Sequence, residues 1–226
     1  NTPLACLASM PSGKAPGGWW TPWAKFMRSL NISHESWPLA KALIISRGSR
    51  SSAEVVLVEI RDGDAAGRGE CMPYAHYGEN VPAVIAVIET LRGAIADGLD
   101  QAGLRAALPP GAARNAVDCA LWDLAAKQTG RPVWRLAGLG APGPLVTAYT
   151  LGVDTPDAMA AVAKENAWRP FLKLKLTGKG DIGRVEAVRD AAPDTKLIVD
   201  ANEGWSPDMV EPFSAELARL NVVMIE

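Results

Sequence analysis

The sequence predicts a mixed α/β protein in two parts, and three observations carry this prediction. Runs rich in β-branched residues, separated by short turns, come first and indicate an antiparallel meander. Two segments with apolar residues at helical spacing follow them. Beyond a loop rich in Pro and Gly near residue 142, short apolar runs alternate with helical segments about every 25 residues, which is typical of a parallel sheet.

In the first part, strands are expected within residues 39–46 and 52–72, where β-branched residues are frequent. A helix is expected over residues 81–98, and a second helix over residues 112–130, with Gly130 as its stop. The apolar residues of the second helix recur at helical spacing: Val117, Ala120, Leu121 and Leu124.

The second part reads as strands separated by helices. The expected strands are residues 145–152, 171–176, 196–202 and 222–226. The expected helices between them are residues 155–168, 181–193 and 206–220. Thr155 and Ser206 are the expected N-caps, because each is followed by a proline in the first helical turn. The absence of a Gly-rich phosphate-binding fingerprint favours a barrel over an open nucleotide-binding sheet.

The composition is that of an ordinary globular protein. The chain has 226 residues, of which 48% are hydrophobic and 21% charged, and its formal net charge is -2. This balance gives no reason to expect nucleic acid or an anionic membrane as a partner. No apolar run approaches the roughly 20 residues of a membrane span. The three cysteines, Cys6, Cys71 and Cys119, form no disulfide framework, so the cytoplasm is the expected location.

The first residues differ from the rest of the chain. Residues 1–33 are expected to be a disordered or artefactual leader, because residues 1–30 are rich in Pro and Gly and lack the features of a secretory signal. A natural start at or near Met27 is the corresponding hypothesis. Two domains are expected after the leader, over residues 34–142 and 143–226.

Ionisable residues close three successive strands of the second part. The segment "FLKLKL" places Lys173 and Lys175 on one face of a strand, because alternate residues share a face. Asp200 closes the next strand and Glu226 the one after it. Two neighbouring ammonium groups are costly to bury unless carboxylates face them. Burial and a neighbouring cation would also lower a lysine pKa toward the range of a usable base.

Each of these features has a simpler explanation when it is taken alone. A Lys-x-Lys pair in a strand is most often a solvated edge, and an Asp at a strand end is most often a cap or turn residue. Together they lie at or near the C-terminal ends of consecutive strands. Parallel α/β proteins bind their ligands at these strand ends. Carboxylates at the mouth of a barrel can hold Mg²⁺, which prefers oxygen ligands. The set therefore predicts a site for a metal and a base.

The same residues show a family resemblance. The segments "KLKL", "LIVDANEGWS" and "VVMIE" resemble the enolase superfamily, and within it the muconate-lactonizing subgroup. The segments "WPLAKALIISRGSRSSAEVVLVEI", "GRGECMPYAHYGE" and "AARNAVDCALWDLAAK" are similar to the dipeptide epimerases of that subgroup. The resemblance covers residues 34–226 and implies an α+β capping domain followed by a modified (β/α)₈ barrel.

The resemblance also implies an activity and a site. The activity is Mg²⁺-dependent epimerisation of dipeptides such as L-Ala-Glu, by α-proton abstraction through an enediolate intermediate. Lys175 matches the acid/base lysine, and Lys173 matches the lysine that supports the substrate carboxylate. Asp200 and Glu226 match two metal ligands, with Asn202 in the second shell of the metal. Arg47 matches a residue that binds a carboxylate of the substrate, and Thr150 matches a threonine that contacts the substrate. His76 is expected to be a solvated loop residue and not catalytic.

The sequence ends at the second of these metal ligands. The third ligand and a lysine on the opposite face of the substrate are not among its residues, so the barrel is expected to be cut at its fourth strand. We therefore expect the 226-residue polypeptide to be inactive alone. Three related activities stay open as alternatives: muconate cycloisomerase, o-succinylbenzoate synthase and N-acylamino acid racemase. A non-catalytic scaffold protein is a further alternative, and homo-oligomerisation is left open.

Overall fold

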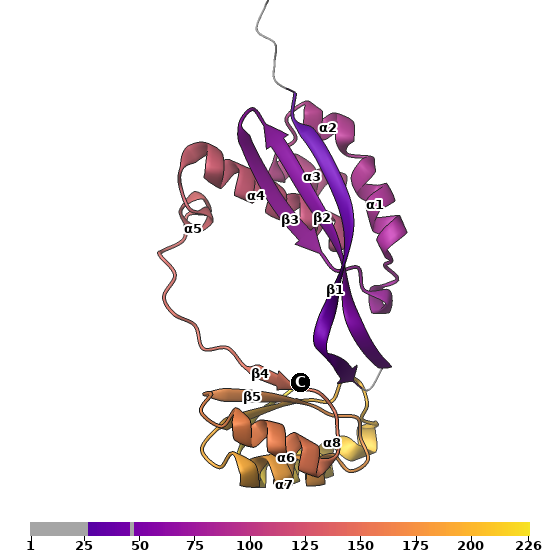
Figure 1. Cartoon of the computed structure of the whole chain (residues 1–226), viewed down its shortest axis with the longest axis vertical. Coiled ribbons are helices and arrows are strands. Elements are labelled where there is room, and N and C mark those ends of the chain that lie inside the picture. The colour runs from indigo at the N-terminus through magenta and orange to yellow at the C-terminus, as the bar shows by residue number, and fades with distance from the viewer. Residues whose placement is uncertain (1–26, 46–47) are drawn as a thin grey trace, which may run out of the picture.

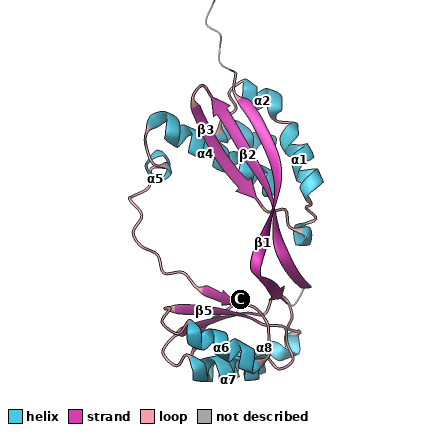
Figure 2. Cartoon of the chain, viewed as in Figure 1, coloured by secondary structure: helices cyan, strands magenta, loops and turns pink. Residues whose placement is uncertain are grey.

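The structure is a computed structural model that describes residues 27–45 and 48–226. It confirms the two-part α/β architecture, with an antiparallel sheet in one part and a parallel sheet in the other (Figure 1). A long loop between residues 137 and 148 joins the two parts (Figure 2). In the described part of the chain, no helix is long and apolar enough to cross a membrane.

The first part begins with an antiparallel sheet in the order β1-β2-β3. The three strands have these bounds: β1 Ser29–Ile45, β2 Gly48–Asp62 and β3 Ala65–Cys71. Helices follow in the chain, most of them on one face of this sheet (Figure 1). They have these bounds: the 3-10 helix η1 Ala75–Tyr77, α1 Val81–Glu89, α2 Arg92–Ala96, α3 Gln101–Ala107, α4 Ala112–Thr129 and α5 Val133–Leu136. The expected antiparallel meander is therefore confirmed.

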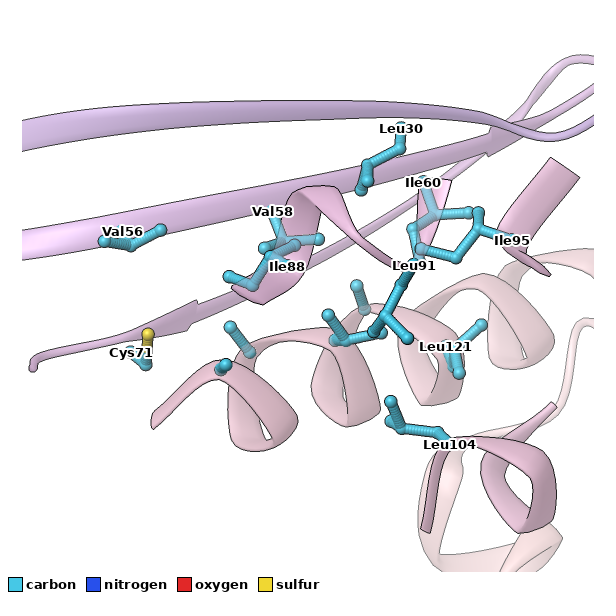
Figure 3. Close-up of a cluster of buried hydrophobic side chains, with 14 of the residues drawn as sticks. Leu30, Val56, Val58, Ile60, Cys71, Ile88, Leu91, Ile95, Leu104 and Leu121 are labelled. Atoms are coloured by element: carbon cyan, nitrogen blue, oxygen red, sulfur yellow. The ribbon is translucent and has the colours of Figure 1, made fainter. Parts of the chain in front are cut away.

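One face of the antiparallel sheet forms the first hydrophobic core (Figure 3). The alternate residues Val56, Val58 and Ile60 of β2 are completely buried, because successive side chains of a strand point to opposite faces. They pack on apolar residues of the covering helices, among them Ile88 and Leu121. All buried residues of this core come from the first part, and their burial stabilises it.

Strand β3 lies directly against helix α4 because it carries two glycines. A Cβ atom added at Gly69 would lie 2.1 Å from the carbonyl oxygen of Ala116, and one added at Gly67 would lie 2.2 Å from that of Ala120. Only residues without a side chain permit backbone contact at this distance. The glycines therefore set the spacing between the sheet and its central helix.

The structure corrects the predicted helices of the first part. The helix expected over residues 81–98 is broken into α1 and α2, because Thr90 donates both its backbone N–H and its hydroxyl to the Val87 carbonyl, at 3.2 and 2.6 Å. Helix α3 was not predicted from its short apolar pattern. Strand β1 begins at Ser29, inside the range 1–33 that was assigned to the leader, and Leu30 is buried in the core.

The second part is a parallel sheet in the order β4-β5-β6-β7. Its strands have these bounds: β4 Tyr149–Leu151, β5 Phe171–Lys175, β6 Lys196–Asp200 and β7 Val222–Ile225. Its helices have these bounds: α6 Pro156–Glu165, α7 Asp181–Ala191 and α8 Pro207–Arg219. Figure 1 shows α6 and α7 on the face of β4 and β5 that points away from the first part. The expected strand–helix alternation is confirmed.

Local signals place the helices as the sequence predicts. The Thr155 side chain caps α6 by accepting a hydrogen bond from the Ala158 amide at 3.3 Å. Ser206 is the N-cap of α8, but its side chain makes no capping hydrogen bond. Gly130 ends α4 in the left-handed conformation, with φ of 63°.

Candidate active site

The strand β5 separates its lysines from its leucines. Leu172 and Leu174, with Leu176 just after the strand, are fully buried in the second hydrophobic core. Lys173 and Lys175 leave the opposite face and keep 21% and 15% of their side-chain surface exposed. The prediction that this strand has one apolar face and one cationic face is therefore confirmed.

The parallel register brings the predicted carboxylates to the lysines. Lys175 lies opposite Asp200 in the pairing of β5 with β6. Glu226 lies just beyond β7 and is fixed beside β6, because its backbone N–H donates to the Val199 carbonyl at 2.8 Å. Ionisable groups that are 25 and 26 residues apart in the sequence thus meet at one end of the sheet.

These four side chains form one charged cluster. The Asp200 Oδ2 atom accepts hydrogen bonds from Lys175 Nζ at 2.6 Å and from Lys173 Nζ at 3.0 Å. Lys173 Nζ also donates to Glu226 Oε2. Asp200 retains only 4% side-chain exposure, whereas Glu226 retains 54%. Lys173 therefore joins an inner and an outer carboxylate, and the outer one is open to an incoming molecule.

The contacts within the cluster favour the charged forms of Asp200 and Lys173. Burial alone would raise the pKa of the Asp200 carboxyl, but hydrogen bonds from Lys175, Lys173 and the Asn202 amide outweigh it and lower this pKa. Burial alone would lower the pKa of Lys173, but its hydrogen bonds to Glu226 and Asp200 outweigh that effect and raise it. The expectation of a lowered pKa is therefore wrong for Lys173, which is held as an ammonium ion.

Asn202 lies next to the cluster. Its backbone N–H donates to Asp200 Oδ1 at 2.9 Å, and its φ of 48° places it in the left-handed region. Because Lys173 and Lys175 bind the other carboxylate oxygen, Asp200 is held through both oxygens. These hydrogen bonds fix the orientation of the Asp200 carboxylate within the cluster.

The structure describes only one of the two predicted substrate contacts. Thr150 lies opposite Lys173 in the pairing of β4 with β5 and is exposed. Arg47 lies outside the described residues. His76 is exposed, and its Nε2 atom is 3.4 Å from Glu203 Oε1 in the loop after β6. This pair joins η1 of the first part to the strand-end loops of the second.

A cavity that the sequence analysis missed lies beside η1. Arg50, Tyr74 and His76 line it, together with Leu43, Gly48, Ser49 and Ala75. The Arg50 guanidinium lies over the Tyr74 ring, 5.3 Å from its centroid, and donates to the Met72 sulfur at 3.4 Å. The β1–β2 hairpin also contacts the second part, where the Val153 amide donates to the Ile44 carbonyl at 3.2 Å. In sequence, Arg50 had no signal beyond its place in the turn "SRGSRS".

Two carboxylates of the cluster have the chemistry of ligands for a divalent metal ion. Asp200 and Glu226 offer the carboxylate oxygens that Mg²⁺ prefers, and the shared contact with Lys173 brings both groups to one place. The residues that the structure describes contain no group of three or more His, Cys, Asp or Glu side chains arranged to hold a metal. The described residues therefore supply two carboxylates at this end of the sheet, Asp200 and Glu226, as candidate oxygen ligands.

The sequence of the chain matches two domain families. Residues 27–138 match the family described as "Mandelate racemase / muconate lactonizing enzyme, N-terminal domain". Residues 157–226 match the family described as "Enolase C-terminal domain-like". The first match covers the antiparallel part with its helices, and the second covers the parallel strands from α6 onward.

Known proteins share both sequence and fold with the chain. The L-Ala-D/L-Glu epimerase of Escherichia coli is 43% identical over 202 residues, which are 88% of this chain and 63% of the relative. A solved enolase family member from Agrobacterium tumefaciens, with homology to dipeptide epimerases and with bound sodium and L-Ala-L-Glu, is 47% identical. It superposes with a TM-score of 0.84 over 88% of this chain and 61% of its own.

A third relative extends the match to other dipeptides. The dipeptide epimerase of Enterococcus faecalis, solved with Mg and L-Leu-L-Tyr, is 30% identical, with a TM-score of 0.78 over 88% of this chain and 60% of its own. The chain spans about three-fifths of the length of these relatives. With both domain families matched and dipeptide epimerases among its relatives, the chain belongs to the mandelate racemase/muconate lactonizing enzyme family of the enolase superfamily.

Proposed function

We propose that the whole protein is a Mg²⁺-dependent dipeptide epimerase that acts on substrates such as L-Ala-Glu. The observation that carries this proposal is the charged cluster of Lys173, Lys175, Asp200 and Glu226 at the ends of β5, β6 and β7. The names of the relatives support the class of reaction, and the relative solved with Mg supports the metal. Because the chain spans about three-fifths of these relatives, the activity is assigned to the whole protein.

The proposed chemistry is the removal and return of the proton on the carbon next to the substrate carboxylate. Lys175 is the proposed base, because it is among the less exposed members of the cluster and its Nζ atom lies at the strand end. Lys173 is held as an ammonium by its carboxylate partners, so its proposed role is to hold the substrate carboxylate by charge. The two lysines thus have different tasks on one strand face.

Asp200 and Glu226 are the proposed Mg²⁺ ligands, and Asn202 supports Asp200 through its amide. Mg²⁺ would offset the negative charge that develops on the substrate carboxylate as the enediolate forms. Glu226 is more than half exposed, so a substrate could approach the carboxylates from its side of the cluster. Without Mg²⁺, the charges of Asp200 and Glu226 are balanced by Lys173 and Lys175 alone.

The substrate side chain is proposed to lie toward the first part. Arg47, Thr150 and Arg50 are the proposed contacts, and Arg50 is added because it lines the cavity beside η1. A guanidinium pairs well with the side-chain carboxylate of a glutamyl residue. An Arg50→Met variant should raise KM for L-Ala-L-Glu at least tenfold with little change for L-Ala-L-Leu, whereas equal losses on both would remove Arg50 from this role.

The wider architecture is part of the proposal. We place the parallel strands in a modified (β/α)₈ barrel and take residues 34–142 and 143–226 as the capping and barrel domains. The match of residues 157–226 to the enolase C-terminal family supports the barrel. A cytoplasmic location agrees with the free thiols of Cys71 and Cys119.

The test is the exchange of the substrate α-hydrogen with solvent. The whole protein is incubated with L-Ala-L-Glu in D₂O, with and without Mg²⁺, and deuterium at the α-carbon of the glutamyl residue is followed by NMR. We expect deuterium to be incorporated only when Mg²⁺ is present and Lys175 is intact. Full retention of the α-proton across a panel of dipeptides would exclude the proposed reaction.

A further inference from the structure

A buried carboxylate lies close to the cluster and has no part in the proposed chemistry. Asp181, the first residue of α7, is completely buried. It accepts hydrogen bonds from the backbone amides of Thr177 and Gly178 at 3.1 and 2.7 Å. It also accepts one from the Trp205 indole Nε1 at 2.8 Å. A single carboxylate therefore joins the loop after β5 to the loop after β6.

Arg184 extends this connection to a third loop. One guanidinium nitrogen of Arg184 is 3.0 Å from Asp181 Oδ1 and also donates to the Lys179 carbonyl at 3.1 Å. Its Nε atom donates to the Asp154 carbonyl, in the loop after β4, at 2.9 Å. We call Asp181, Arg184 and Trp205 the loop clamp. It links the loops that follow three consecutive parallel strands.

The clamped loops touch through their backbones. A Cβ atom added at Gly178 would lie 2.9 Å from the Gly204 carbonyl oxygen, and one added at Gly204 would lie 3.0 Å from the Thr177 carbonyl. Both contacts are closer than real Cβ atoms ordinarily allow, so the two loops can pack only with glycine at these positions. The hydrogen bonds of Asp181 and this backbone contact therefore act on the same pair of loops.

The loop after β6 adopts a backbone that needs such support. Asn202 and Glu203 both lie in the left-handed region, with φ of 48° and 63°. Non-glycine residues keep this conformation where surrounding contacts determine it. Trp205 anchors the end of the loop through Asp181, and its ring packs edge-to-face on Phe213 at 5.2 Å. The loop begins directly after Asp200.

The loop clamp is connected to the catalytic cluster through short stretches of chain. Thr177, which donates to Asp181, is two residues beyond Lys175. The Leu176 amide donates to the Asp200 carbonyl at 2.9 Å, and the Asn202 amide donates to Asp200 Oδ1. Movement of either loop would therefore change the position of Asp200 relative to Lys175.

We propose that Asp181 is a positioning residue, which through Trp205 and Arg184 holds the strand-end loops so that Lys175 and Asp200 meet. This inference rests on the proposed function, because it assigns the loop clamp to the metal-and-base site. Its effect should be local. Loss of the clamp should free the amides of Leu176 and Asn202 and weaken Mg²⁺ binding, while the rest of α7 stays folded.

The test compares four variants of the 226-residue chain. Asp181→Asn removes the charge at nearly constant volume, and Trp205→Phe removes only the indole N–H while it keeps an aromatic ring on Phe213. Asp190→Asn makes the same chemical change at an exposed site of α7. Val188→Ala lowers stability at a fully buried site of α7 that is not one of the three clamp residues.

Two measurements are made on each variant. Amide hydrogen exchange is followed at Leu176 and Asn202, and Mg²⁺ affinity is measured by titration calorimetry. The two clamp variants should speed exchange at these amides about tenfold, the change expected when a hydrogen bond to a charged group is lost, and weaken Mg²⁺ binding several-fold. Asp190→Asn should change neither quantity, and Val188→Ala should speed exchange throughout the second part alike.

The outcomes separate this inference from the proposed function. If the clamp variants behave like Asp190→Asn or like Val188→Ala, Asp181 has no positioning role. If they speed exchange locally but bind Mg²⁺ as tightly as the original chain, the clamp is structural and the inference is overturned. If the original chain binds no Mg²⁺, the proposed metal site fails, and the local exchange still decides whether the clamp holds the strand ends. If Asp181→Asn does not fold, Trp205→Phe gives the same answers.

Discussion

Replacing Asp200 by asparagine removes the charge at the centre of the cluster while it keeps the volume of the side chain. Asp200 is almost fully buried and accepts hydrogen bonds from Lys175 at 2.6 Å and Lys173 at 3.0 Å. The asparagine amide would keep one acceptor oxygen and would present N–H donors in place of the other. The variant would therefore leave two ammonium groups close together with less compensation.

The size of the effect follows from the exposure of the partners. Breaking a fully buried pair costs about 3–5 kcal/mol of stability, because the remaining charge stays buried and unpaired. Here Lys173 and Lys175 keep 21% and 15% exposure, and Lys173 keeps Glu226, so the loss should be smaller. We expect Asp200→Asn to lower the free energy of unfolding by about 2–3 kcal/mol.

The assay is urea unfolding of the chain at neutral pH with EDTA, followed by Trp fluorescence and circular dichroism. Asp190→Asn, on the exposed side of α7, should change stability by less than about 0.5 kcal/mol. Adding Lys175→Met to Asp200→Asn should restore part of the loss, because the uncompensated ammonium is removed. An Asp200→Asn chain as stable as the Asp190→Asn chain would refute this account of the cluster.

Three further predictions concern packing and thiol chemistry. Gly69→Ala should cost about 3 kcal/mol or more, because its Cβ would lie 2.1 Å from the Ala116 carbonyl oxygen, whereas Gly93→Ala, with open space around it, should be neutral or stabilising in the same urea titration. Leu174→Ala empties a fully buried position of the second core and should cost about 2–5 kcal/mol in the same urea titration. Burial raises the pKa of the Cys71 thiol to about 11, so at pH 8 Cys71 should resist iodoacetamide until guanidinium is added. Peptide mapping distinguishes Cys71 from the exposed Cys119, and rapid labelling of Cys71 in the folded chain would contradict this.

The sequence predicts those features that depend on local pattern. The alternation in "FLKLKL" is enough to place Lys173 and Lys175 on one face, and the recurring strand–helix spacing is enough to align Asp200 with them. Such features repeat with a period that needs no knowledge of the tertiary fold. The caps at Thr155 and Gly130 were predictable for the same reason.

The features that the sequence does not reveal depend on contacts between distant segments. The role of Asp181 requires that Trp205, which is 24 residues away, lies beside it, and a carboxylate in the first turn of a helix is ordinarily a solvated residue. The place of Arg50 beside His76 depends on the fold of the β1–β2 hairpin. The break at Thr90 depends on one hydroxyl, which propensity alone does not resolve.

The central claim is that this chain supplies the base and two metal ligands of an epimerase, and α-hydrogen exchange on L-Ala-L-Glu tests it most directly. In D₂O with Mg²⁺, the whole protein should place deuterium at the glutamyl α-carbon, and Lys175→Ala and Asp200→Ala should each reduce the rate at least a hundredfold. The Asp190→Ala control should retain the rate. Exchange that persists in the Lys175→Ala and Asp200→Ala proteins, or its absence from the unaltered protein, would contradict the claim.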